Sequence, residues 1–374
     1  MTEVMEAAGK RNTGLDLLRA LCMLAIVMLH YLYSADALLW SEPAQGAFPP
    51  SETVRTLGTL LYCFAICLVN PFVIMSGYLL YDRAFSLRRF FELLCTVVFF
   101  GIGVQLVMTL VTGEGPSGAY EWVQALFPVS SRHYWFMTSY LFMYPFAPLV
   151  VTGTKAFDKK QLRMLIAIAV VFLSLIKSIV PVRFVTDEGG YNVAWFLLLV
   201  LIGAYLRKYE DDGFLAGARS LFWYVICALA IFVLTVGVRT LTISGGGFLT
   251  LFEILRDYNF ILCLAAGVGI FVFFKDLPLR ADTAPAGFLA ALSAHTIGAY
   301  LLHAHPALFY VWLSYVCLLL GNVPDKNPAL FLLHCAGSVL IAFFAGVATD
   351  CVRALLFRAA AHLTGKGKEK EKGD

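Results

Sequence analysis

Long apolar stretches separated by short polar segments run through almost the whole chain. Read in windows of helical length, they predict an all-α, polytopic membrane protein with about ten transmembrane helices. The expected spans are residues 14–34, 57–81, 89–112, 134–152, 162–181, 192–206, 220–238, 258–275, 290–320 and 329–357. The ninth is longer than one bilayer crossing, and we expect a break at 303–306, where a proline frees backbone groups.

Composition agrees with this pattern. The chain is 60% hydrophobic and 14% charged, whereas soluble domains are about a quarter charged. It predicts one membrane domain (14–357) between a cytoplasmic segment (1–13) and a charged, disordered cytoplasmic tail (358–374). No pattern suited to nucleic acid is present, so the expected surroundings are a lipid bilayer.

Positive charge is distributed unevenly between the two sides of the predicted bundle. Of the 28 lysines and arginines, twenty fall on the side of the N-terminus and six on the other. Because cytoplasmic loops carry the excess of positive charge, both termini are predicted to be cytoplasmic.

The first span carries three ionisable residues in an apolar run. Arg19 and His30 are eleven positions apart, which returns them to nearly one helix face about 16 Å apart. Asp16 precedes Arg19 by three positions and can pair with it. Since ionisable residues within a span are costly, the three indicate a functional site. Alternatively, Asp16 and Arg19 extend to the interface and His30 caps the far end.

Two further features lie toward the predicted cytoplasmic side. Arg83, Arg88 and Arg89 precede the third span; singly they are anchors, but as a group they suit the phosphates of an anionic cosubstrate. Ser76, inside the second span, is explained equally by close helix packing or by a site.

The opposite side carries aromatic and charged candidates. Trp135 and Tyr140 suit an aromatic belt or stacking on sugars. Glu253 precedes Arg256 and Asp257, a spacing typical of a structural ion-pair network.

Within the ninth span, His303 has His305 nearby but no carboxylate or cysteine at matching spacing, so no metal site is expected.

Taken in order, these segments resemble the family 3 integral membrane acyltransferases over residues 11 to about 357. The resemblance rests on the Arg-x10-His spacing from Arg19 to His30 and on three further motifs. These are Ser76-Gly77-Tyr78-Leu79-Leu80, Trp135-Phe136 and Gly298…Tyr300-Leu301-Leu302-His303.

The resemblance implies a multi-pass cell-membrane O-acyltransferase. It would move an acyl group, usually acetyl, from cytoplasmic acyl-CoA (acetyl-CoA) to a hydroxyl of an envelope or exported glycan, or of a lipid-linked sugar, on the outer side. Acetyl-CoA would serve as cosubstrate, without a metal.

It also implies residue roles. His30 would be the catalytic base or the acyl carrier, Arg19 would serve the donor, and Asp16 would hold Arg19. The remaining roles divide into donor contacts and acceptor contacts. The donor set is Arg83, Arg88, Arg89 and Ser76; the acceptor set is Trp135, Tyr140, Glu253 and His303. Some relatives carry an Arg-x-x-Arg pair before the third span, whereas here Arg88 and Arg89 are adjacent, which leaves open which arginine meets CoA.

A second interpretation is a secondary transporter or exporter of an envelope precursor. It also accounts for about ten spans with buried charges. A transporter favours inverted repeats with paired broken helices, and the sequence has no such symmetry.

Overall fold

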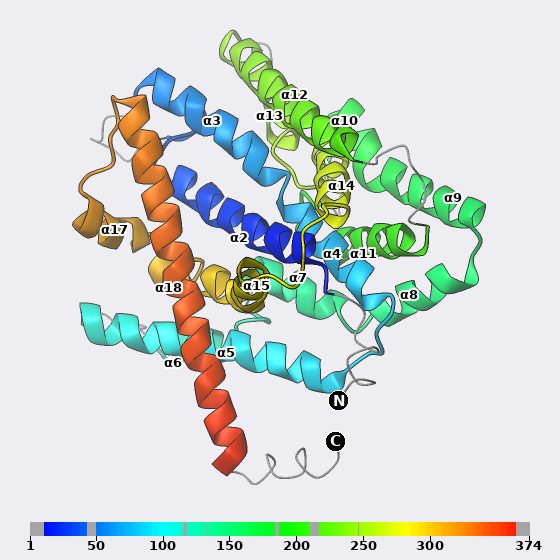
Figure 1. Ribbon diagram of the computed structural model, residues 1–374. Coiled ribbons are helices and arrows are strands. Elements are labelled where there is room, and N and C mark those ends of the chain that lie inside the picture. The colour runs from blue at the N-terminus through cyan, green and yellow to red at the C-terminus, as the bar shows by residue number, and fades with distance from the viewer. Residues whose placement is uncertain are drawn as a thin grey trace.

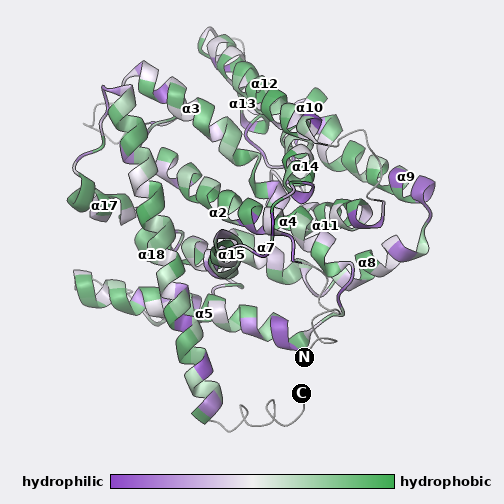
Figure 2. Ribbon diagram, viewed as in Figure 1, coloured by the Kyte–Doolittle hydropathy of each residue, from purple (hydrophilic) through white to green (hydrophobic). Residues whose placement is uncertain are grey.

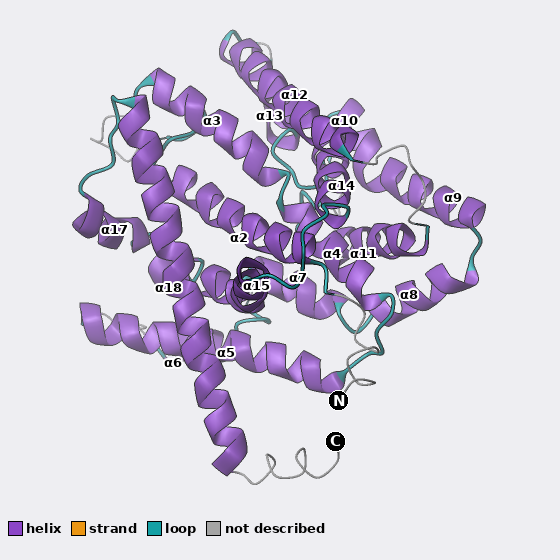
Figure 3. Cartoon of the chain, viewed as in Figure 1, coloured by secondary structure: helices purple, strands orange, loops and turns teal. Residues whose placement is uncertain are grey.

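The computed structural model describes residues 11–42, 50–113, 115, 118–131, 133–183, 187–209, 217–245 and 247–363. Most of the expected N-terminal segment and most of the charged tail lie outside the described residues. Every regular element in the described ranges is helical (Figure 3). The predicted all-α fold is confirmed.

The chain forms a series of long helices interrupted by short ones. In order they are α2 (Thr13–Ser34), α3 (Glu52–Ile66), α4 (Val69–Leu80), α5 (Leu87–Thr112), α6 (Ala119–Leu126), α7 (Trp135–Met143), α8 (Ala147–Ala156), α9 (Lys159–Val170), a π-helical turn (Val171–Leu175), α10 (Ile176–Ile179), α11 (Val193–Lys208), α12 (Ala218–Ile243), α13 (Leu249–Ile254), α14 (Ile261–Lys275), α15 (Ala284–His303), α16 (Pro306–Phe309), α17 (Trp312–Leu320) and α18 (Pro328–Leu363).

Several of these helices can cross a membrane. Among the described residues, seven are long and apolar enough, and α7 with α8, bent by 49°, makes an eighth if the pair is one span. A multi-pass helical membrane protein is therefore confirmed. The other two expected spans correspond to α11 and α14, with 16 and 15 residues. At 1.5 Å per residue they reach about 24 and 22 Å, less than the roughly 30 Å of a hydrocarbon core. The count of ten and the cytoplasmic termini stay predictions.

The expected break in the ninth span is present. α15 ends at His303 and α16 begins at Pro306. The break places His303 at a helix end, where its ring can face a neighbouring helix.

α2 lies at the centre of the bundle (Figure 1). It packs against α15, α18, α3, α14 and α4. Leu18, Cys22 and Val27 on this helix are fully buried. Figure 2 shows polar residues near helix ends, such as the start of α5 and the end of α18, and hydrophobic residues along the middles. The buried polar side chain of Asp16 on α2 therefore faces protein and not lipid.

Glycines permit two close helix contacts. A Cβ on Gly77 of α4 would overlap the backbone oxygen of Val200 in α11. A Cβ on Gly298 of α15 would overlap the backbone oxygen of Gly346 in α18. Small residues allow such approach of membrane helices. Gly77 and Gly298, which belong to two of the sequence motifs, therefore have a packing role.

Candidate active site

Asp16 anchors the first turns of α2 to α15. Its carboxylate is buried, with Arg11 Nε 2.6 Å from one oxygen and Ser293 Oγ donating at 2.7 Å to the other. The expected partner, Arg19, is farther away, with Nη1 at 3.8 Å. Arg11 and Ser293 therefore hold Asp16 more closely than Arg19 does. Sequence reasoning treated Arg11 only as part of the charge pattern, because nothing local shows that it folds back onto the helix.

Arg19 lines a cavity of about 270 Å³ between α2, α4, α5, α7 and α15. Three other predicted residues, Ser76, Arg89 and Tyr140, line the same cavity. The hydroxyls of Ser76 and Tyr140 are 3.1 Å apart. Tyr140, expected near the acceptor, thus lies with the donor candidates. The cavity offers two guanidinium groups and a hydroxyl pair, a set suited to an anionic, amide-containing ligand.

Arg83 lies in the loop before α5 and Arg88 and Arg89 in its first turn, and the three have different surroundings. Arg89 lines the Arg19 cavity, whereas Arg88 Nε pairs with Glu92 at 2.7 Å on the surface, where 70% of the Arg88 side chain is exposed. Arg83 lines a smaller neighbouring cavity of about 160 Å³. Tyr144 lines both cavities. Of the adjacent pair, Arg89 is thus the arginine that faces the same cavity as Arg19.

His30 meets His303 at the other end of α2. His30 Nδ1 and His303 Nε2 are 2.7 Å apart, and the edge of Phe309 packs on the His30 ring at 5.0 Å between centroids. The other nitrogen of His303, Nδ1, bonds to the backbone oxygen of Ala299. His303 itself is 1% exposed, whereas His30 is partly buried.

The contacts of His303 determine the tautomers of a neutral pair. A carbonyl oxygen only accepts, so His303 Nδ1 carries the proton and donates to Ala299. His303 Nε2 is then an acceptor, and His30 Nδ1 must donate to it. Consequently the Nε2 of His30 holds a free lone pair. That nitrogen has the form required of a general base or a nucleophile.

Aromatic rings connect the Arg19 cavity to the histidine pair. Phe136 lines the cavity and contacts Tyr300, with 5.9 Å between ring centroids. Tyr300 in turn contacts His303 at 6.3 Å. The two ends of α2 are therefore parts of one packed region, separated by the roughly 16 Å that regular helix rise gives for eleven residues.

Trp135 belongs to an aromatic cluster apart from the cavity. Its ring lies 4.2 Å from Tyr191 and stacks on Tyr258 at 5.4 Å, centroid to centroid. Arg256 stacks on Trp40 at 4.8 Å. The cluster supplies flat ring faces near the loop that follows α13.

Glu253 lies at the edge of a buried ion network. Its carboxylate is 3.8 Å from Arg183, and its side chain is 45% exposed. The expected partner Arg256 stacks on aromatic rings instead. Asp257, the third member of that expected network, pairs with Arg183 at 3.0 Å.

The centre of this network is Lys177, which sequence reasoning did not select. It is fully buried, and its ammonium donates at 2.7 Å to Asp187, 2.7 Å to Asp257 and 2.6 Å to Asn259. Burial raises the pKa of Asp187, but hydrogen bonds from Lys177 and Asn259 outweigh it and hold the pKa below its usual value. The signal in the sequence that could have identified it is a lysine inside an apolar run.

The histidines at the α15 break do not converge on one point. His305 Nε2 bonds to the backbone oxygen of Gly101 at 3.0 Å, whereas His303 faces His30. Within the described ranges, no group of three or more histidine, cysteine or acidic residues is placed to hold a metal ion.

These features define a polytopic helical membrane protein whose central helix carries a cation-lined cavity at one end and a histidine pair at the other. The chain belongs to acyltransferase family 3, since its sequence matches the family's acyltransferase domain over residues 12–347. It is therefore a membrane acyltransferase. No curated protein and no solved structure matches the chain.

Proposed function

We propose that the protein is an O-acyltransferase that moves an acetyl group from cytoplasmic acetyl-CoA to a hydroxyl of a cell-envelope or exported glycan in the cell membrane. The observation that carries this proposal is the arrangement on α2, where Arg19 lines a cavity and His30, eleven residues farther along the helix, bonds His303. Membership in the acyltransferase family favours this function over the transporter.

The donor would bind at the Arg19 cavity. Arg19 and Arg89 provide cationic groups for the phosphates of CoA, and the Ser76 and Tyr140 hydroxyls can bond to the pantetheine amides. With the cavity at the cytoplasmic end of α2, as the charge pattern predicts, the pantetheine arm would extend along the helix toward His30.

The chemistry then follows from the tautomer of His30. Its Nε2 takes the proton of the acceptor hydroxyl, and the hydroxyl oxygen bonds to the thioester carbonyl carbon. The C–S bond breaks, and the CoA thiolate takes the proton back from His30. In a two-step variant, Nε2 itself first carries the acetyl group. In either case His303 Nε2 accepts a hydrogen bond from His30 Nδ1 and so stabilises the positive charge on the His30 ring.

The acceptor would approach from the opposite side of the membrane. Trp135, Tyr191 and Tyr258 offer aromatic rings for a sugar. Glu253, whose side chain is 45% exposed, offers a carboxylate. These groups are the proposed acceptor contacts.

The test is acetyl-CoA turnover by the purified protein in liposomes, with glycan acceptors on one side and CoA release measured on the other. Wild-type protein should release CoA, and His30→Ala should lower the rate by at least about 100-fold, because a general base typically contributes that much. His133→Ala is the control, since His133 bonds to Ser131 and Gln124 away from α2. Equal turnover in wild type and His30→Ala would remove His30 from the chemistry.

A further inference from the structure

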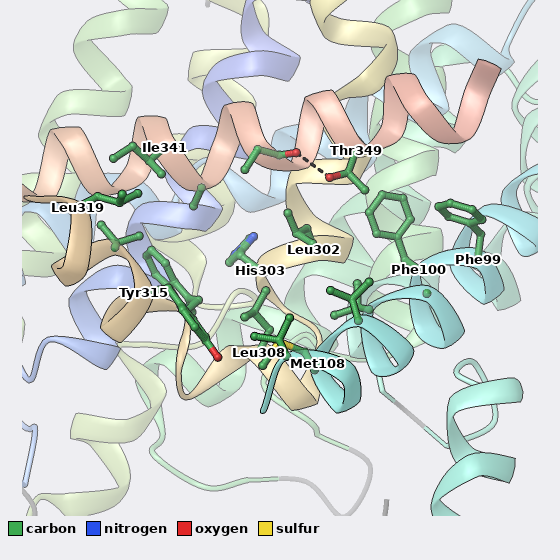
Figure 4. Close-up of a pocket in the computed structure, with 18 residues that line it drawn as sticks. Phe99, Phe100, Met108, Leu302, His303, Leu308, Tyr315, Leu319, Ile341 and Thr349 are labelled. Atoms are coloured by element: carbon green, nitrogen blue, oxygen red, sulfur yellow. Dashed lines mark hydrogen bonds between the residues drawn. The ribbon is translucent and has the colours of Figure 1, made fainter. Parts of the chain in front are cut away.

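A second, larger cavity lies beside the histidine pair and lacks a role in the function described so far. It measures about 520 Å³ and is lined by α5, the α15–α17 segment and α18. Figure 4 shows the His303 ring among apolar side chains that include Leu302, Leu308 and Met108. Its volume is within the range of small-molecule sites.

The inner wall of this cavity is buried and its rim is exposed. Phe100, Val104 and Trp312 in the wall are at most 7% exposed. On the rim, Val111 is 65% exposed and Leu319 is 72% exposed. α5 and α18 are both long and apolar enough to span a membrane, so in a bilayer the exposed rim would face hydrocarbon. The cavity is thus open to a chain that arrives from the bilayer.

Two of the polar residues in the lining, His303 and Trp312, are buried. His303 bonds His30. Trp312, whose ring lies 6.2 Å from that of His303, has a buried indole N–H without an acceptor among the described residues. A buried donor without an acceptor is costly, so an oxygen of a bound molecule would stabilise this wall.

We propose that this cavity binds the hydrocarbon chain of a lipid-linked acceptor, and that its polar headgroup presents the reacting hydroxyl at the histidine pair. The proposal rests on the acyltransferase function proposed above and narrows the acceptor to a membrane lipid that carries a sugar. An apolar channel that opens to the bilayer at one end and at the other reaches His303, the hydrogen-bond partner of the candidate base, matches such a molecule. A soluble glycan would make no use of the apolar wall.

The alternative occupant is the acyl tail of a longer acyl-CoA. Its donor would enter from the Arg19 cavity, which has a separate lining and shares no residue with the apolar cavity. An acyl tail that arrives through the protein interior would not need the cavity to open at the exposed rim on α5 and α17. The bilayer is therefore the favoured source.

Gly103 provides a way to fill the cavity without disturbing the catalytic residues. It lines the cavity in α5, and a Cβ added there meets nothing within 4 Å. Gly237 in α12 is a matched control, because it also lies in an apolar spanning helix and has open space at its Cβ position. Both glycines accept leucine without a clash at Cβ.

The experiment compares Gly103→Leu and Gly237→Leu in liposomes with acetyl-CoA and two acceptors that carry the same sugar, one on a polyprenyl phosphate and one as a methyl glycoside. Gly103→Leu should raise KM for the polyprenyl-linked sugar at least about tenfold relative to the methyl glycoside, since apolar contact is lost. Gly237→Leu should leave that ratio unchanged. An unchanged ratio in Gly103→Leu overturns the proposal. A selective loss of octanoyl-CoA use relative to acetyl-CoA assigns the cavity to the donor tail and overturns it as well.

A binding readout separates this proposal from the proposed function. Wild-type protein in vesicles is labelled with a diazirine-bearing polyprenyl phosphate, and the labelled peptides are mapped. Labelling should fall on α5, α17 and α18 and drop at least about fivefold in Gly103→Leu, for the same loss of apolar contact. Such labelling without acetyl transfer by wild type would refute the proposed function and leave the lipid site. Labelling no stronger than with a diazirine phospholipid would show that ordinary lipid fills the cavity, which overturns the proposal.

Discussion

At the scale of single residues, His303 orients the candidate base. Its Nε2 accepts a hydrogen bond from His30 Nδ1, with 2.7 Å between the two nitrogens, and its own Nδ1–H donates to the backbone oxygen of Ala299. A neutral imidazole that donates a hydrogen bond from one nitrogen has its other nitrogen oriented and unprotonated. His303 was expected to contact the acceptor; from this geometry we infer that it positions His30 instead.

Replacing His303 tests that role. His303→Leu removes the acceptor for His30 Nδ1 and should lower kcat roughly 10- to 100-fold, the usual cost of losing an orienting partner, with KM for acetyl-CoA unchanged. His303→Gln restores an acceptor oxygen and should recover part of kcat. Initial rates across a pH series give both values. A fall in KM alone, or no recovery with glutamine, would contradict the positioning role.

The adjacent arginines in the first turn of α5 provide a matched pair. Arg89 lines the Arg19 cavity and Arg88 pairs with Glu92 on the surface. Arg89→Ala should raise KM for acetyl-CoA roughly tenfold, because a charge-assisted hydrogen bond to phosphate contributes about that much. Arg88→Ala should leave KM unaltered. Steady-state kinetics measure KM for acetyl-CoA in the two variants. Equal changes in KM would exclude Arg89 as the specific donor contact.

At the scale of elements, α15 connects both ends of the site. Ser293 bonds Asp16 near the start of α2, Thr296 lines the Arg19 cavity, and His303 bonds His30. Gly298, between them, brings α15 against α18. The position of one helix therefore determines the geometry at two separate places.

Gly298 and Gly287 test this dependence within one helix. A Cβ on Gly298 would overlap the backbone of α18, whereas one on Gly287 meets nothing within 4 Å. Gly298→Ala should cost about 1–3 kcal/mol through overpacking and lower turnover with it. Gly287→Ala should be neutral or stabilising by up to about 1 kcal/mol, because alanine favours helix. Thermal unfolding in detergent measures both. A stable and active Gly298→Ala variant would show that α15 and α18 can separate without consequence.

At the scale of the whole molecule, the Lys177 network joins distant parts of the chain. It connects α10 to Asp187, which precedes α11, and to Asp257 and Asn259, which precede α14. Removing one member of a buried ionic cluster leaves uncompensated charge, which is strongly destabilising. The network therefore stabilises the end of the bundle that carries the aromatic cluster around Trp135.

The lowered pKa of Asp187 predicts a specific pH dependence. A carboxyl whose folded-state pKa lies below its unfolded value near 4 adds stability that is complete above that unfolded value. This contribution disappears as the pH falls through the folded-state pKa. The melting temperature of wild type should exceed that of Asp187→Asn by a constant margin at pH 5 and above, and the margin should narrow below about pH 4. A margin that is independent of pH down to 3 would contradict the assignment.

Much of the architecture was predictable from the sequence because it depends on local properties. Apolar length and helical periodicity identified helices at every expected span, and Pro306 marked the break after His303. The number of membrane spans could not be read directly from the apolar segments, because α11 and α14 are apolar but shorter than a bilayer crossing. Burial within protein and burial in lipid produce the same hydropathy.

The sequence by itself also determined which residues on α2 are unusual, because Asp16, Arg19 and His30 are ionisable residues in an apolar helix. Only the tertiary structure decided their partners. Arg11 holds Asp16, His303 orients His30, and Arg89 joins Arg19 while Arg88 does not. The physical reason is that helix type is set by neighbours in sequence, whereas a partner is set by how the chain folds back and which helix faces pack together, as for His30 and His303, which are 273 positions apart.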